Sequence, residues 1–345
     1  MGARAFIAGI AGTVLTDRER AFFRESEPWG LILFKRNINT PDQVRRLTGS
    51  FRDAVARADA PVLVDQEGGR VQRLGPPHWP CYPPGAAYGR LYDGDAEEGL
   101  AAARLGARLI ATDLAAVGID VDCWPLADVP VAGADAVIGD RAFGSNPEKV
   151  AAIAGAVAEG LRDGGVLPVI KHIPGHGRAM ADSHRELPVV NADRKSLEET
   201  DFRAFRPLAG LPLAMTAHVV FTAIDPVTPA TTSVTIVREV IRGLIGFDGM
   251  LMTDDISMEA LTGSIRARSR ASLAAGCDMV LHCNGRFDEM CEVAEAVPPL
   301  EGAAARRATA ALAWRRPAPD IDVAEARRQF AATMPSVRAG EAVRS

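Results

Sequence analysis

Short runs of almost continuously apolar residues recur along the chain, separated by longer segments in which apolar positions return with a helical period. Eight such runs lie at residues 6–10, 30–34, 61–65, 119–123, 167–171, 213–217, 250–254 and 277–281. Runs of this kind are typical of β-strands that are covered on both faces, as the strands of parallel sheets are. The pattern therefore predicts eight buried, parallel strands.

Five of the intervening segments have the spacing of amphipathic helices: 42–58, 97–118, 147–165, 233–246 and 264–276. Pro147 stands at a suitable first helical position, and glycines follow the end of the same segment. Alternating strands and helices predict parallel βαβ units and an α/β fold. Eight units favour a closed (β/α)8 barrel. An open, doubly wound sheet would give similar alternation and stays the alternative.

We expect one catalytic domain with a helical extension at its C-terminal end. Residues 1–300 hold all eight strand candidates and are predicted to form the barrel domain. Residues 301–345 are rich in Ala and Arg, which predicts one or two helices packed on the barrel. The last few residues are expected to fray, as chain ends often do.

Composition and charge narrow the class of protein. The 345 residues contain 39 Lys and Arg and 44 Asp and Glu, which gives a net charge of −5. This balance argues against a nucleic-acid-binding protein, because such proteins usually carry a basic excess. Five cysteines without a CxxC pair indicate reduced thiols rather than a disulfide framework. No run approaches the roughly 18 apolar residues of a membrane span, and the first residues lack a signal pattern. We expect a cytoplasmic protein without a membrane anchor.

Polar residues end or directly follow most of the predicted strands. They are Asp65, Lys171 with His172, His218, Asp254 with Asp255, and His282. In a parallel barrel these positions share the C-terminal face, where barrel enzymes carry their chemistry. Strand ends often meet water, so a single polar residue there means little. So many titratable groups at the same end predict one shared pocket.

The densest polar segment is KHIPGHGRAMADSHRELP, at residues 171–188. His172 and His176 are four residues apart, which suggests a metal site, but ligands at this spacing share a face only on a helix. Pro174 and its neighbouring glycines exclude that helix. We favour a long, ordered loop that carries an acid/base group. In the DSH triplet, Asp182 can accept a hydrogen bond from one nitrogen of His184 and leave the other nitrogen for proton transfer.

Two further segments add candidate binding residues. In DQEGGRVQR (65–73), Asp65 precedes a glycine turn and Arg73 follows it; carboxylate and guanidinium groups there suit sugar hydroxyls or carboxylates. The glycines match neither of the nucleotide-binding patterns GxGxxG and GxxxxGK(S/T), so nucleotide binding is unsupported. Arg141 in GDRAFG adds a second cation, for which a surface salt bridge is the alternative.

The third segment of this kind is MTDDISMEAL, at residues 252–261. Asp254 ends the seventh strand and could be a nucleophile, a base or a helix cap. Asp255 and Ser257 are the better candidates for capping the helix that follows.

Taken together, these segments resemble the β-N-acetylhexosaminidases of glycoside hydrolase family 3 in their bacterial single-domain form. The resemblance spans roughly residues 5–300, and KHxPGHG followed by DSH is its most specific part. The matching segments, in chain order, are GLILFKRNI, DQEGGRVQR, GDRAFG, KHIPGHG, DSH, MTAHV, PATTS, TDDISM and AGCDMVLHCN.

The resemblance implies a TIM barrel and a retaining, two-step hydrolysis of terminal β-linked GlcNAc. It assigns Asp254 as the nucleophile and His184, oriented by Asp182, as the acid/base. The implied substrate is GlcNAc-β-1,4-anhydroMurNAc, with or without its peptide, in peptidoglycan recycling. We expect no metal, no cofactor and a monomer. The implied sugar-binding residues are Asp65, Arg73, Arg141, Lys171 and His172.

Small departures from the family pattern, at Ile173 and in the RAMA run of 178–181, leave the loop position and the aglycone preference open. Because the 172–186 loop is rich in glycine and small residues, we expect it to bring His184 to Asp254 only on closure. Two other functions remain open. One is a phosphorylase in which phosphate replaces water, and the other is a sugar-binding protein without catalysis.

Overall fold

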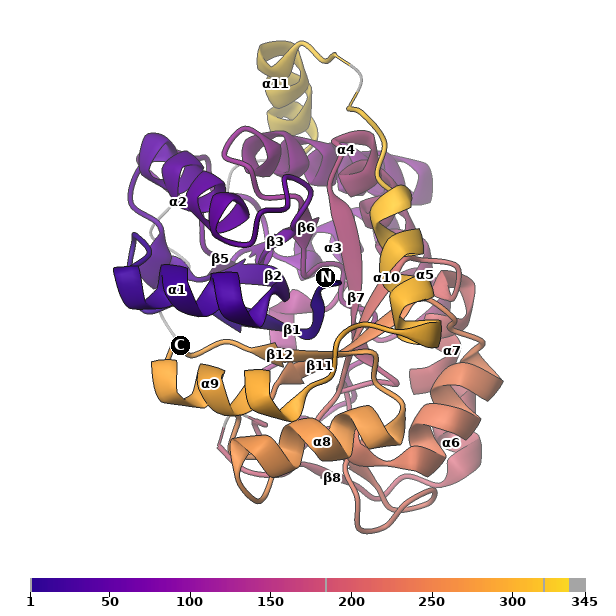
Figure 1. Ribbon diagram of the computed structural model, residues 1–345. Helices are drawn as coiled ribbons and strands as arrows, with labels where there is room; N and C mark the ends of the chain where they lie inside the picture. Colours follow the sequence, from indigo (N-terminus) through magenta and orange to yellow (C-terminus); the bar gives the residue numbers. More distant parts are fainter. Residues whose placement is uncertain (1, 184, 319, 335–345) are drawn as a thin grey trace.

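The computed structural model describes residues 2–183, 185–318 and 320–334. Eight parallel strands close into a barrel in the order β1-β12-β11-β9-β7-β6-β3-β2. Each barrel strand is followed along the chain by a helix on the outside of the barrel (Figure 1). The predicted (β/α)8 barrel is therefore confirmed, and the open sheet is excluded.

The barrel strands coincide with the eight apolar runs to within two residues at every end. They are β1 (Arg4–Gly9), β2 (Pro28–Leu33), β3 (Val62–Val64), β6 (Val121–Asp122), β7 (Leu167–Ile173), β9 (Leu213–Thr216), β11 (Met250–Asp255) and β12 (Met279–His282). Two short pairs lie outside the barrel. They are β4 (Gln66–Gly68) with β5 (Val71–Gln72), and β8 (Val189–Val190) with β10 (Val220–Phe221).

All five predicted helices are present, and further helices complete the outer layer. The α-helices are α1 (Asp17–Ser26), α2 (Pro41–Ala54), α3 (Gly85–Gly94), α4 (Ala96–Ala115), α5 (Pro147–Asp163), α6 (Arg194–Glu199), α7 (Asp201–Phe205), α8 (Ile265–Ala275), α9 (Phe287–Ala296), α10 (Gly302–Ala313) and α11 (Val323–Thr333). Single turns of 3-10 helix are η1 (Lys35–Asn37), η2 (Gly139–Arg141), η3 (Arg206–Leu208) and η4 (Ala230–Thr232). The segment predicted at 233–246 forms the π-helix η5 (Ile236–Ile245). None of the described helices combines the length and apolar character needed to cross a lipid bilayer.

Local sequence signals fix several helix ends. The side chains of Thr40, Asn146 and Ser264 accept hydrogen bonds from the third residue of α2, α5 and α8, which satisfies a backbone donor that the helix leaves unpaired. Helix α8 is followed by Gly276 as its C-cap, whose φ of 112° is readily adopted only by glycine. These signals are local in sequence, so the helix positions could be predicted well.

Two apolar layers surround the strands because successive side chains of a strand point to opposite faces. In β7, Leu167 and Val169 face the barrel interior, whereas Ile170 and Ile173 belong to the layer between strands and helices. All four are fully buried. This double burial explains why the strands read as continuous apolar runs rather than as alternating ones.

The C-terminal helices pack on two different parts of the barrel (Figure 1). Ala308 and Ala311 of α10 join the interior cluster and so cover one end of the barrel. Helix α11 packs on α4, and its Phe330 ring lies 6.2 Å from Tyr82 and 6.4 Å from Tyr88. The division into residues 1–300 and 301–345 stays a prediction, and the end expected to fray, 335–345, lies outside the described residues.

Candidate active site

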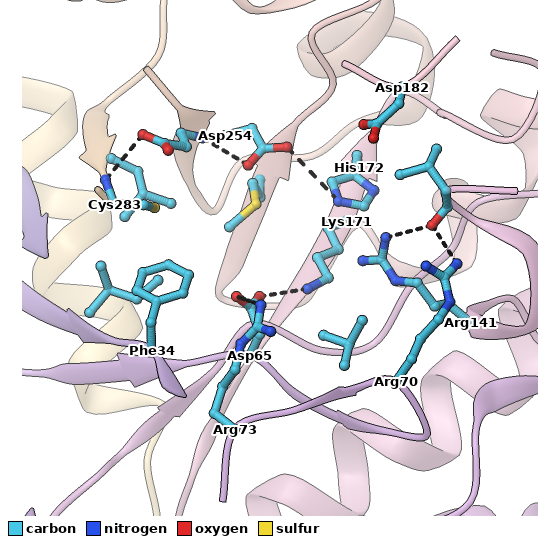
Figure 2. Close-up of a pocket in the computed structure, with 16 residues that line it drawn as sticks. Phe34, Asp65, Arg70, Arg73, Arg141, Lys171, His172, Asp182, Asp254 and Cys283 are labelled. Atoms are coloured by element: carbon cyan, nitrogen blue, oxygen red, sulfur yellow. Dashed lines mark hydrogen bonds and ion pairs between the residues drawn. The ribbon is translucent and has the colours of Figure 1, made fainter. Parts of the chain in front are cut away.

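A pocket of about 280 Å³ opens at the C-terminal ends of the barrel strands. Seven of the eight residues predicted for the site line it, and Figure 2 shows them converging from different strands and loops. They are Asp65, Arg73, Arg141, Lys171, His172, Asp182 and Asp254. The eighth, His184, lies outside the described residues. The barrel thus brings together side chains that are far apart in the sequence.

Asp65 and Lys171 form the centre of the pocket floor. Lys171 Nζ lies 2.9 Å from Asp65 Oδ1, and Arg73 Nη2 lies 3.3 Å from Asp65 Oδ2. Burial opposes ionisation of Asp65, but Lys171 and Arg73 outweigh it and hold the pKa of this carboxyl below its usual range. Asp65 is therefore a carboxylate that can accept hydrogen bonds from hydroxyl groups.

The turn after Asp65 requires glycine at two positions. Gly68 and Gly69 have φ of 89° and 58°, and a Cβ at Gly68 would lie 2.3 Å from the Pro83 carbonyl oxygen. The Gln66 side-chain oxygen accepts hydrogen bonds from the backbone N–H groups of Arg73 and of the next residue. This turn therefore fixes Arg73 opposite Asp65, as the motif suggested.

Glu67 is a site residue that the sequence analysis missed. Its side chain is 2% exposed and receives two hydrogen bonds from Arg141, at 2.8 and 2.9 Å, while Lys171 Nζ lies 2.6 Å from Oε1. Burial opposes ionisation here too, but Arg141 and Lys171 lower the pKa of Glu67 below its ordinary value. Arg141 is thus held by a buried carboxylate at the pocket, and the surface salt bridge considered above is excluded. No local sequence signal distinguishes Glu67 from an ordinary loop residue.

His172 lies between two carboxylates. Its Nδ1 is 2.7 Å from Asp128 Oδ2. Its Nε2 is 4.0 Å from Asp254 Oδ2, a contact that is drawn in Figure 2. Asp128 is fully buried; burial opposes its ionisation, but His172 holds the pKa of Asp128 below its usual value. Asp128 was also missed by the sequence analysis. Because Asp128 accepts a hydrogen bond from His172 Nδ1, the other ring nitrogen, Nε2, is directed toward Asp254.

Asp254 stands at the pocket end of β11 with a side chain that is 18% exposed. Its Oδ1 accepts the backbone N–H of Asp255 at 2.8 Å. Asp255 in turn accepts hydrogen bonds from the backbone and hydroxyl of Ser257 and from the backbone of Cys283. The prediction that Asp255 or Ser257 caps the next helix is wrong, because α8 begins later and Ser264 caps it. Asp255 instead closes the turn that presents Asp254.

The DSH triplet reaches the same pocket through its first residue. Figure 2 shows Asp182 above His172 with its carboxyl group directed toward the pocket. Ser183 is 3% exposed, and its carbonyl accepts a hydrogen bond from the backbone N–H of Ala260. The expected pairing of Asp182 with His184 lies outside the described residues, as does the expected position of His184 relative to Asp254.

Two histidines expected at the shared pocket do not line it. His218 is fully buried with its ring between Thr231 Oγ1, at 2.7 Å, and the Asp255 carbonyl, at 3.0 Å. Burial lowers the pKa of His218. His282 lies 3.1 Å from Glu289, outside the pocket lining. Both residues support the strand ends from behind rather than facing the pocket.

A (β/α)8 barrel with a pocket of buried, ionised carboxylates and cations at this face has the arrangement of a barrel enzyme's active site. Residues 15–311 match the family model described as glycosyl hydrolase family 3 N terminal domain. The chain belongs to glycosyl hydrolase family 3, and it is a glycoside hydrolase. The resemblance found in its motifs is thereby confirmed.

Relatives and solved structures agree with this membership. The chain is 43% identical over 280 residues to a beta-hexosaminidase of Alkalilimnicola ehrlichii, covering 80% of this chain and 79% of that protein. It is 37% identical to a beta-hexosaminidase of Chromobacterium violaceum over 333 residues, 95% and 92% of the two chains. The crystal structure of NagZ from Neisseria gonorrhoeae in complex with N-trifluoroacetyl-D-glucosamine superimposes with a TM-score of 0.86 at 32% identity, covering 97% and 99%.

Proposed function

We propose that the protein is a retaining exo-β-N-acetylglucosaminidase in which Asp254 is the nucleophile. The observation that carries this proposal is the position of Asp254, a partly exposed carboxylate that shares one pocket with the Asp65 and Lys171 pair. The names of the relatives, and the N-acylated glucosamine in the complex of the Neisseria protein, support the choice of sugar.

The pocket has partners for both the polar and the apolar parts of such a sugar. Asp65 accepts from ring hydroxyls, and Lys171, Arg73, Arg141 and His172 donate to hydroxyl or acetamido oxygens. The side chains of Phe34, Met215 and Leu281 form apolar parts of the wall and suit a sugar face or an acetyl methyl. A cavity of about 280 Å³ lies at the small end of ligand pockets, which favours recognition of one terminal residue.

The reaction proceeds in two steps. Asp254 attacks the anomeric carbon while the acid/base His184, oriented by Asp182, protonates the oxygen of the leaving group. Water then displaces Asp254 from the glycosyl-enzyme as His184 takes up the proton of the attacking water, so the product keeps the β configuration. In the first step the bond from the anomeric carbon to the aglycone oxygen breaks as the bond to Asp254 forms. In the second step the bond to Asp254 breaks as the bond to the water oxygen forms, so two inversions give overall retention.

The natural substrate that we propose is GlcNAc-β-1,4-anhydroMurNAc, with or without its peptide, in cytoplasmic peptidoglycan recycling. The support for this substrate is the motif resemblance over residues 5–300 together with the family membership. The monomeric state belongs to the same proposal.

The test compares wild type with Asp254→Ala on an aryl β-N-acetylglucosaminide and on the matching β-glucoside, with Asp288→Ala as an exposed control. We expect wild type to prefer the acetamido sugar and to release β-GlcNAc first, as followed by NMR. The kcat of Asp254→Ala should be at least about a thousandfold lower than that of wild type. Added azide should then yield the α-glycosyl azide, because azide enters from the side that the carboxylate has vacated.

Three results contradict the proposal. They are full activity of Asp254→Ala, first release of the α anomer by wild type, and no preference for the acetamido sugar. Formation of GlcNAc-1-phosphate in phosphate buffer, in place of free GlcNAc, would identify a phosphorylase.

A further inference from the structure

Asp128 is a buried carboxylate that contacts two separate parts of the KHIPGHG segment. One oxygen accepts the backbone N–H of His176 at 2.6 Å, and the other lies 2.7 Å from His172 Nδ1. The backbone N–H of His172 lies 3.2 and 3.3 Å from the two oxygens. Asp128 is fully buried, so these contacts are not exchanged with water. It therefore joins the end of β7 to the beginning of the following loop.

His176 extends this connection toward the DSH triplet. Its Nε2 lies 3.2 Å from Ser183 Oγ, and both side chains are almost completely buried. Burial, reinforced by neighbouring His172, lowers the pKa of His176 to about 4, so the ring is neutral near pH 7. The rings of His172 and His176 pack edge to face with centroids 5.6 Å apart. We call Asp128, His172, His176 and Ser183 the Asp128 network.

Other contacts fix the loop at a different place. Gly177 and Ala179 accept backbone hydrogen bonds from residues 131 and 135, and Arg178 pairs with Asp201 at 2.6 Å. These contacts hold residues 177–179 against neighbouring loops. Ser183 lies beyond them, and its contacts with His176 and with the backbone of Ala260 connect the Asp182 end of the loop to neighbouring parts of the barrel face.

We propose that Asp128, His176 and Ser183 are positioning residues, which hold the Asp182 segment at the pocket through the His176–Ser183 hydrogen bond. The inference rests on the proposed function, in which this segment supplies the general acid. Asp128 holds His172 and His176 in a fixed position relative to each other through its hydrogen bonds to both. Ser183 connects the Asp182 segment to this pair through its hydrogen bond with His176. None of the three has to touch the substrate.

The test uses Ser183→Ala with aryl β-N-acetylglucosaminides of a good leaving group, 2,4-dinitrophenol, and a poor one, phenol. A general acid helps the poor leaving group far more, because dinitrophenolate leaves without protonation. The quantity to compare is kcat/KM, which reports the first step alone, since His184 also acts as base in the second step for every substrate. We expect kcat/KM for the phenyl substrate to fall at least about tenfold in Ser183→Ala, with kcat/KM for the dinitrophenyl substrate within about twofold of wild type. Ser183→Thr, which keeps the hydroxyl, should recover most of the loss.

Ser272→Ala is the matched control, since Ser272 is a buried serine whose hydroxyl forms a hydrogen bond within α8, to the Ser269 carbonyl, away from the pocket. It should leave both substrates unchanged. Equal losses on both substrates in Ser183→Ala, or no loss, would overturn the inference, because a purely structural role does not depend on the leaving group.

The second variant is Asp128→Asn, which keeps the shape of the side chain but places an amide where His172 and His176 need acceptors. We expect Asp128→Asn to lower kcat/KM for both substrates. It should also raise the leaving-group selectivity, the ratio of kcat/KM for the dinitrophenyl substrate to that for the phenyl substrate, as Ser183→Ala does. In the double variant, the selectivity should be no larger than in the more selective single variant; additive effects would show that the two residues act independently and would overturn the inference.

The outcomes separate this inference from the proposed function. If Asp254→Ala is inactive and Ser183→Ala shows no leaving-group effect, only the positioning role is wrong. If Asp254→Ala keeps full activity, the proposed function itself is wrong. Should Asp128→Asn fail to fold by circular dichroism, the Ser183→Ala, Ser183→Thr and Ser272→Ala series decides alone.

Discussion

Replacing His176 by Gln should reduce the loss of folding stability that the protein undergoes at acid pH. His176 is 3% exposed and its pKa is lowered to about 4, first by burial and second by the neighbouring His172. In the unfolded chain the same imidazole titrates near its ordinary value of about 6.5. Between these two values the unfolded state binds a proton that the native state does not bind.

The sign and the size of the effect follow from this difference. Because the unfolded state binds more protons, the free energy of unfolding rises with pH across the window from about 4 to about 6.5. Acid therefore removes stability as the pH falls through this window. Linkage for this one group gives a loss of about 2 kcal/mol at pH 5 relative to pH 8. Gln cannot take up the proton, so His176→Gln should lack this part of the loss.

The assay is urea unfolding of wild type and His176→Gln at pH 5 and pH 8, with His78→Gln as an exposed-histidine control. The quantity of interest is the change in unfolding free energy between the two pH values, from which any constant cost of the substitution cancels. We expect this change to be smaller by about 2 kcal/mol in His176→Gln than in wild type. A difference below about 0.5 kcal/mol, or an equal effect in the control, would refute the reasoning.

Three further substitutions test charge pairing beside the pocket and packing between the outer helices. Glu67→Gln leaves two buried cations without their shared carboxylate and should cost about 3 kcal/mol in urea unfolding and raise KM for the aryl substrate; an unchanged KM would contradict the site described above. Phe330→Ala should lower stability by about 3 kcal/mol, because the ring fills a space beside Tyr88, and kcat should stay at the wild-type value. Gly89→Ala would place a Cβ 1.8 Å from the Phe143 carbonyl oxygen and should lower Tm clearly in a thermal scan, whereas an unchanged Tm would show that α3 can shift.

The alternation of strands and helices could be predicted from the sequence because its causes are local. A strand covered on both faces has to be apolar throughout, and residues 250–254 show this over a single short run. Helix starts such as Asn146–Pro147 depend on hydrogen bonds within one turn. Polar residues at strand ends, such as Asp65 and Asp254, could also be predicted, since the shared direction of parallel strands brings their ends to one face.

The charge partners of the site could not be predicted in this way. Glu67 pairs with Arg141, 74 positions away, and Asp128 holds His172, 44 positions away. Neither carboxylate differs in its local sequence from a solvent-exposed loop residue. A carboxylate that is buried away from water needs a charged or hydrogen-bonding partner, because an unpaired buried charge is costly. Which carboxylates are buried is decided only when the chain folds.

The sequence alone determined the alternation of strands and helices, the strand ends that carry the chemistry and the motifs that resemble the family. Only the tertiary structure decided which strand-end residues face the pocket. His218 and His282 follow or end strands as Lys171 and Asp254 do, yet they pack behind the pocket on Thr231 and Glu289. The physical reason is that a side chain's direction at a strand end depends on the closing of the barrel and on contacts with distant loops, which no short stretch of sequence contains.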